Sequence, residues 1–91
     1  MKLFAIFLTS NDERLDEICT VKVEMLNADG SVLDTQYHQN SSFKSVGELI
    51  HNRNRDGVEM SVLDYGDELR GIITPLGDLV THSYVITKFI D

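Results

Sequence analysis

The chain has 91 residues, of which 42% are hydrophobic and 25% are charged, and its formal net charge is −7. This composition is that of an ordinary globular protein, and the length supports one domain with one hydrophobic core. The negative charge repels nucleic acid and anionic membrane surfaces, so we expect no direct binding to either of them.

The first predicted element is a strand in the apolar run Leu3–Leu8. Both alternating sets of side chains in this run are apolar, which is typical of a strand covered on both faces. The run is shorter than the apolar part of a signal peptide, and no apolar stretch long enough to span a membrane is present. The single cysteine, Cys19, cannot form an intramolecular disulfide, which favours a reducing, cytoplasmic compartment.

A helical turn and a hairpin are predicted next. Ser10 and Glu13 have the spacing of a capping box, which predicts one helical turn or a charged loop. Apolar and polar residues then alternate over positions 19–25, as in a strand with one buried face. The residues of Asn27–Gly30 tolerate positive φ, and the alternation resumes over Val32–His38, so these two strands are predicted to form a hairpin.

One main helix is predicted in the middle of the chain. Ser45 and Glu48 have the second capping-box spacing, ahead of apolar residues at helical intervals, and Phe43 is expected to pack beneath the helix. The basic segment 51–55 at the end of the helix is a candidate phosphate contact. Such a segment is more typical of a solvated helix end, where positive charge stabilises the exposed carbonyls. Asp56 and the glycine after it are expected to end the helix.

Three further strands are predicted in the last third of the chain. They cover Val58–Val62, Leu69–Thr74 and Leu79–Ile90, with an acidic connection at 65–68 and a tight turn at Pro75–Asp78. The last strand is longer and more apolar than a solvent-exposed edge tolerates. We therefore expect it to be central in the sheet or covered by another subunit.

The predicted fold is α+β, with residues 1–91 forming a single small domain. Its main feature is a mostly antiparallel sheet of about five to six strands, with one main helix packed on one face. The order of elements shows no internal repeat and no linker, so no second domain is expected.

The sequence predicts no catalytic centre, no metal site and no cofactor. Cys19 lies on the inward side of a patterned strand and has no cationic neighbour that would lower the pKa of its thiol. Three histidines lie on different predicted elements, without the close spacing of a zinc site, at His38, His51 and His82. Asn27–Gly30 lacks the acidic first residue and the final glutamate of a calcium loop, and no glycine-rich phosphate-binding motif is present. We therefore expect a protein that is not an enzyme.

Acidic residues concentrate in two short segments, which are 12–17 and 64–68. Their carboxylates are those of Asp12, Glu13, Asp16, Glu17, Asp64, Asp67 and Glu68. Solubility alone explains acidic residues in surface loops. The alternative is a recognition surface, on which carboxylates imitate the charge of a nucleic-acid backbone and bind a basic groove, with Tyr65 as an anchor.

The leading functional prediction is a non-enzymatic, acidic protein-binding module that inhibits or regulates a basic, nucleic-acid-handling protein. Immunity proteins and phage-encoded anti-defence proteins tend to have this size and charge. The predicted contacts are the seven carboxylates above together with Tyr65. The alternative is a structural or assembly subunit that oligomerises through its apolar C-terminal strand, in the simplest case as a homodimer. A small-molecule-binding or enzymatic domain would need a pocket that the sequence does not reveal.

Overall fold

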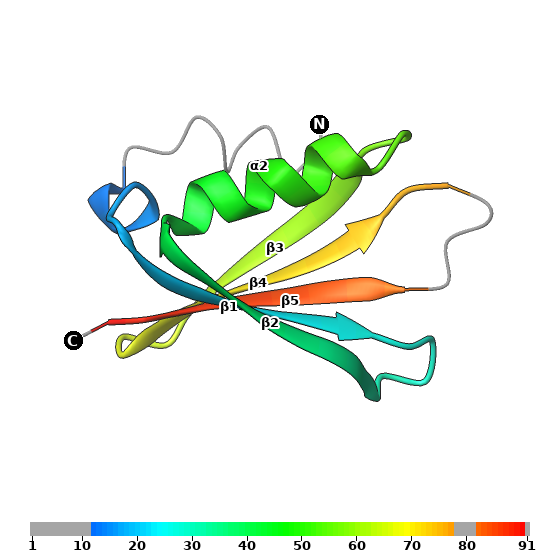
Figure 1. Cartoon of the computed structure of the whole chain (residues 1–91), viewed down its shortest axis with the longest axis horizontal. Helices are drawn as coiled ribbons and strands as arrows, with labels where there is room; N and C mark the ends of the chain where they lie inside the picture. The colour runs from blue at the N-terminus through cyan, green and yellow to red at the C-terminus, as the bar shows by residue number, and fades with distance from the viewer. Residues whose placement is uncertain (1–11, 78–81, 91) are drawn as a thin grey trace.

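The computed structural model describes residues 12–77 and 82–90 of the chain. In these residues one helix packs on one five-stranded antiparallel sheet, with the strand order β2-β1-β5-β4-β3 (Figure 1). This arrangement confirms the predicted α+β class. The elements are η1 (Glu13–Leu15), β1 (Cys19–Leu26), β2 (Val32–Ser41), α2 (Phe43–Arg53), β3 (Val58–Asp64), β4 (Glu68–Pro75) and β5 (Ser83–Phe89).

The strand predicted at Leu3–Leu8 and the beginning of the strand predicted at Leu79–Ile90 lie outside the described residues, as does Ser10. The predicted helical turn is present as the short 3-10 helix η1. Its N-cap is Asp12, whose carboxylate accepts a hydrogen bond from the backbone N–H of Arg14 at 3.0 Å. A carboxylate at this position satisfies a backbone donor that the turn itself leaves unpaired.

The last strand, β5, is central in the sheet, which is one of the two positions expected for it. Ile86 faces Val23 of β1 on one side and Gly71 of β4 on the other. Both edges of β5 are therefore paired, and another chain could add to this strand only by displacing β1 or β4. The outer strands of the described sheet are β2 and β3.

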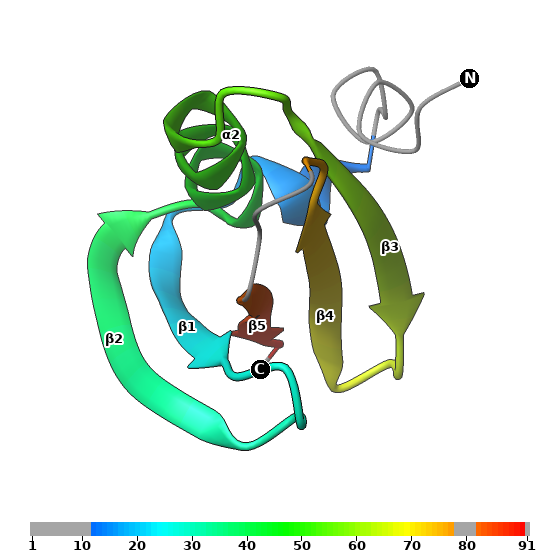
Figure 2. The same cartoon turned by 90° about the vertical axis from the view of Figure 1, so that its right-hand side faces the viewer.

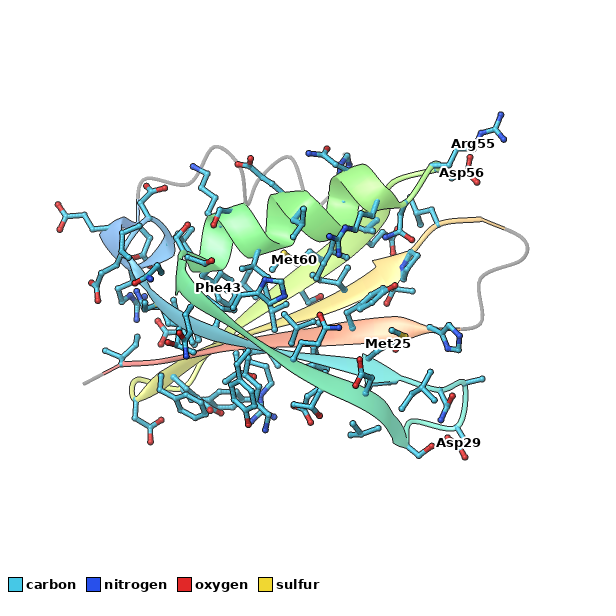
Figure 3. The ribbon with its side chains drawn as sticks, viewed as in Figure 1. Met25, Asp29, Phe43, Arg55, Asp56 and Met60 are labelled. Atoms are coloured by element: carbon cyan, nitrogen blue, oxygen red, sulfur yellow. The ribbon has the colours of Figure 1, made fainter. Side chains whose placement is uncertain are left out.

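The sheet is strongly curved, and α2 lies across its concave side (Figure 2). We call the face towards α2 the inner face and the opposite face the outer face. The core fills the space between the inner face of the sheet and the helical elements η1 and α2. Phe43 and Met60 lie in this core (Figure 3). Its buried apolar residues are Leu15, Val21, Val23, Phe43, Val46, Ile50, Val58, Met60, Leu69, Ile73 and Ile86.

Helix α2 begins one turn earlier than the sequence predicts. Its N-cap is Ser42, whose Oγ accepts the backbone N–H of Ser45 at 3.1 Å, while Ser45 Oγ accepts the backbone N–H of Ser42 at 3.0 Å. The predicted box of Ser45 with Glu48 is therefore wrong, because Ser45 is already the third residue of the helix. Phe43 is the first helical residue, and its side chain is fully buried. It attaches the start of the helix to the sheet.

Candidate functional site

Arg14 joins the two acidic segments at one end of the sheet. One nitrogen of its guanidinium, Nη2, lies 2.7 Å from Oδ2 of Asp12 and 2.7 Å from Oδ2 of Asp64. Asp12 caps η1 and Asp64 ends β3, so segments that are distant in the sequence meet in space. We call the seven predicted carboxylate residues together the acidic end, comprising Asp12, Glu13, Asp16, Glu17, Asp64, Asp67 and Glu68.

A buried lysine in β5 supports the acidic end. The side chain of Lys88 is 1% exposed, and its Nζ donates a hydrogen bond to the backbone oxygen of Arg14 at 2.5 Å. The same Nζ lies 3.5 Å from Oε1 of Glu17. The backbone N–H of Ile90 also donates to the carbonyl of Asp67 at 2.8 Å. The end of β5 is thus bonded to both acidic segments, which gives them a common rigid support.

Ion pairs neutralise only part of the charge at the acidic end. Arg70 Nη2 lies 2.7 Å from Oε1 of Glu68, whereas Glu13 and Asp67 are exposed and make no ion pair with another described residue. Five of the seven carboxylates pair with four cations, which are Arg14, Lys44, Arg70 and Lys88. Seven negative and four positive charges leave a local net charge of −3. The surface therefore remains acidic after its internal pairs are counted.

Arg14 lowers the pKa of both of its carboxylate partners. For Asp12 the largest cause is the hydrogen bond from the Arg14 side chain, followed by the bond from the Arg14 backbone. For Asp64 the side-chain hydrogen bond from Arg14 again comes first, and the backbone N–H of Gly66 adds to it. Both groups therefore stay charged at a pH where an ordinary aspartate, with a pKa of about 3.9, becomes protonated.

Replacing Arg14 with glutamine is expected to raise the pKa of both Asp12 and Asp64 towards the ordinary value. Because their folded-state pKa values are lowered, the stability that these groups contribute is present above the ordinary pKa and is lost as the pH falls through the folded pKa. The variant should therefore be less stable than the parent at pH 6, and this difference should shrink below about pH 3. Carboxyl carbon NMR titration measures the two pKa values directly.

Asp29 is the internal control for this titration. Its pKa is also lowered, but by hydrogen bonds from Ser31 in the β1–β2 turn, so it should not respond to the loss of Arg14. Unchanged titration of Asp12 and Asp64 in the variant would show that Arg14 does not join the two segments in solution.

Two exposed aromatic rings border the acidic end. Tyr65, which the sequence singled out, is 55% exposed, and the guanidinium carbon of Arg70 lies 5.4 Å from the centre of its ring. Phe89 is 59% exposed and lies opposite Glu68 in the pairing of β4 with β5. The sequence interpretation missed Phe89 because the whole strand reads as apolar. The period of two, taken from buried Ile86, would have placed it on the outer face.

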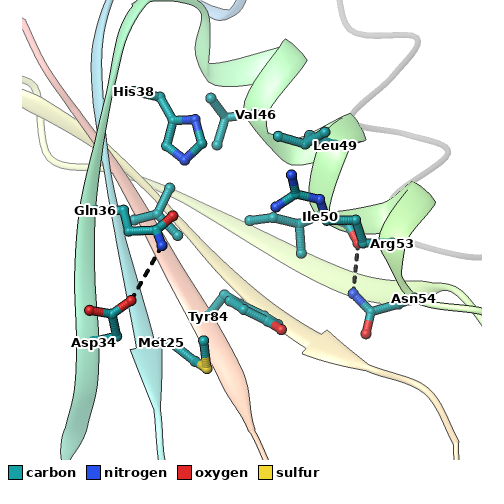
Figure 4. A pocket seen from close by; sticks show the side chains of 11 residues that line it. Met25, Asp34, Gln36, His38, Val46, Leu49, Ile50, Arg53, Asn54 and Tyr84 are labelled. Carbon is teal, nitrogen blue, oxygen red and sulfur yellow. Dashed lines mark hydrogen bonds between the residues drawn. The ribbon is translucent and has the colours of Figure 1, made fainter.

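A second candidate site, separate from the acidic end, lies between α2 and the edge strand β2. It is a groove with a volume of about 130 Å³ (Figure 4). Its floor is apolar and includes Val23, Met25, Ile50 and Tyr84. Its sides are polar and carry Asp34, Gln36 and His38 from β2, with Arg53 from α2. No pattern in the sequence predicted this groove.

A reactive cysteine, a metal site and a membrane-spanning helix each have requirements with which the described residues can be compared. Cys19 is partly buried, and this burial raises the pKa of its thiol. A smaller fraction of the side chain is therefore in the reactive thiolate form. Over residues 12–77 and 82–90, no three His, Cys, Asp or Glu side chains are grouped so that they could hold a metal ion. In the same part of the chain, no helix has the length and apolar character needed to cross a membrane.

The two acidic segments that the sequence singled out meet at Arg14, which pairs with Asp12 of one segment and Asp64 of the other. The groove at β2 has the shape of a pocket, with both apolar and charged residues in its walls. These two surfaces are the features from which a function can be argued. No family model, curated protein or solved structure matches the chain.

Proposed function

We propose that the protein is a non-enzymatic, acidic protein-binding module that inhibits or regulates a basic, nucleic-acid-handling protein through its acidic end. The observation that carries this proposal is the ion pair of Arg14 with both Asp12 and Asp64, which makes one surface of two acidic segments. Carboxylates on a rigid surface can take the place of phosphates in a basic groove, and their field accelerates association.

The distribution of charge favours recognition over solubility. Seven of the 15 acidic residues of the chain belong to the acidic end, although solubility requires only a net charge and no gathering of it. At the opposite end of the molecule, Asp29 and Asp56 stand apart from one another (Figure 3). A concentrated field at one end orients an approaching basic partner before contact.

Tyr65 and Phe89 supply what a charged surface alone lacks. Binding free energy in protein interfaces comes mostly from a few large side chains that lose contact with water, and aromatic residues are enriched among them. Both rings are more than half exposed beside the carboxylates. In the proposed complex these rings are the desolvated anchors, and the acidic end supplies orientation and speed of association.

A pull-down with charge-reversed bait tests this function. The test variant carries Glu13→Lys, Asp16→Lys and Asp67→Lys, which avoids the carboxylates paired with Arg14 and leaves the support of the acidic end intact. We expect the parent protein to enrich a basic partner from a lysate of its source organism, and the test variant to lose it.

The control variant carries Glu48→Lys, Asp56→Lys and Glu59→Lys, at exposed or partly exposed positions outside the acidic end. Each replacement of a carboxylate by lysine raises the net charge by two, so three replacements change it from −7 to −1 in both variants. Total charge therefore cannot explain a difference between the two variants. The proposal fails if no basic partner is enriched, or if the two variants retain the partner equally.

A further inference from the structure

We propose a second binding site, formed by the outer edge of β2 and the groove beside α2, for an extended peptide segment of a partner protein. The peptide would add to the sheet as a strand next to β2. It would place one apolar side chain in the groove and a carboxylate opposite Arg53. This site goes beyond the proposed function, because it lies away from the acidic end and selects the opposite charge.

The edge of β2 offers the backbone groups that such a strand needs. β2 is the longest strand, with ten residues, and it is paired only with β1 among the described elements. An edge strand presents a row of free N–H and C=O groups along its outer side, and an extended peptide can satisfy them. Asn40, with a φ of 53°, interrupts this edge near its end, so the usable stretch is 32–39.

The register of β2 places its polar side chains where the added strand would pass. Asp34, Gln36 and His38 face the same side of the sheet as Met25, Val23 and Val21, which are inner-face residues of β1.
These three β2 side chains line the groove, and helix α2 leaves Asp34 and Gln36 exposed. A strand added beside them would point every second side chain towards the same groove.

The size of the groove fits one side chain. Its volume of about 130 Å³ is close to that of an engineered cavity of about 150 Å³ that holds one benzene molecule. Pockets for whole small molecules are usually about 300–1,000 Å³. An apolar side chain of a peptide, held in place by backbone hydrogen bonds, therefore fits this groove better than a separate small molecule does.

The charges of the groove favour a carboxylate in the peptide. Arg53 extends from α2 towards the strand side of the groove, and its guanidinium makes no ion pair with another described residue (Figure 4). His38 lies on the opposite wall. The one acidic side chain, Asp34, accepts a hydrogen bond from Gln36 at 3.3 Å. An Asp or Glu two positions from the apolar anchor would lie on the same face of the peptide, within reach of Arg53.

A random-octapeptide phage library, panned against the full chain at 150 mM salt, tests the site. We expect enriched peptides to share an apolar residue with Asp or Glu two positions away. The corresponding synthetic peptide, labelled with a fluorophore, should bind in a polarisation assay and shift the backbone NMR signals of residues 32–39. Absence of such a consensus, or shifts confined to residues 64–68, would overturn the proposal.

Two matched variants decide whether Arg53 is responsible. Arg53→Glu is expected to weaken the peptide by about tenfold or more, and Arg55→Glu, the same change at an exposed residue that does not line the groove, by less than about twofold. Equal losses in both variants would overturn the site. The triple reversal at the acidic end should leave peptide binding unchanged, so this site and the proposed function can fail independently.

Discussion

Replacing Gly71 with alanine is expected to lower the free energy of unfolding by about 2–3 kcal/mol, because the added methyl group has no space. A Cβ at this position would overlap Cε of Met60, and it would lie 2.9 Å from Cγ1 of Ile86 and 3.1 Å from Cζ of Phe43. Phe43 and Ile86 are fully buried, so neither can move away freely. Gly71 thus allows the first residue of α2 to reach the centre of the sheet. Urea unfolding measures the loss.

The flexible side chain of Met60 allows a more specific test of the same contact. If crowding is the cause, Gly71→Ala should cost less in a Met60→Ala background than in the parent, since the nearest obstructing atom is then absent. Additive losses in the double variant would contradict this account, because they would show that the loss does not come from contact between the added methyl group and Met60.

Replacing Lys88 with alanine is expected to cost about 3 kcal/mol. The substitution removes a fully buried aliphatic stem and leaves the backbone oxygen of Arg14 without its donor. Lys88→Met retains most of the buried volume, so it should cost less, about 1–2 kcal/mol for the lost hydrogen bond. Thermal unfolding of both variants at pH 7 gives the comparison.

The methionine variant distinguishes two views of this buried charge. Removing an ammonium group from water costs free energy. Replacing a buried charged residue with an apolar residue of similar volume therefore sometimes stabilises a protein. A Lys88→Met variant that is more stable than the parent would therefore show that the bonds to Arg14 and Glu17 do not offset desolvation. We expect the reverse, because the carbonyl of Arg14 would lose the hydrogen bond that Lys88 donates to it.

Most of the strands could be predicted because their local pattern carries the information. β1 and β3 each alternate with a period of two, and the apolar positions Val21, Val58 and Met60 are buried as that pattern indicates. Val62 continues the alternation in β3 but is 41% exposed. On the outer strand β3 the core ends before Val62, whereas on the neighbouring β4 it extends to Leu69. This extent of the core is a tertiary property that no local pattern contains.

The caps were harder to predict than the elements. Ser42 and Ser45 lie close together at the start of α2, and from the sequence alone either one satisfies the local rule for an N-cap. Ser42 is the N-cap, which makes Phe43 the first helical residue and allows its ring to be buried over Gly71. Packing of one aromatic ring therefore decides which serine caps the helix.

The candidate sites depend on strand order, which one sequence does not reveal. The acidic end forms because β5 runs between β1 and β4 and is bonded to both acidic segments through Lys88 and Ile90. The groove forms because β2 is an edge strand, so the side chains of Asp34 and Gln36 line a space beside α2. The seven carboxylates could be named from the sequence, whereas the meeting of their two segments at Arg14 required the fold.

Association kinetics with the purified basic partner test the central claim most directly. We expect the association rate constant of the Glu13→Lys, Asp16→Lys, Asp67→Lys variant to fall by about tenfold at 50 mM salt, and its dependence on salt to flatten. The control variant, altered at Glu48, Asp56 and Glu59, should stay within about twofold of the parent. Equal rate constants and equal salt dependence for the two variants would show that the acidic end does not guide binding.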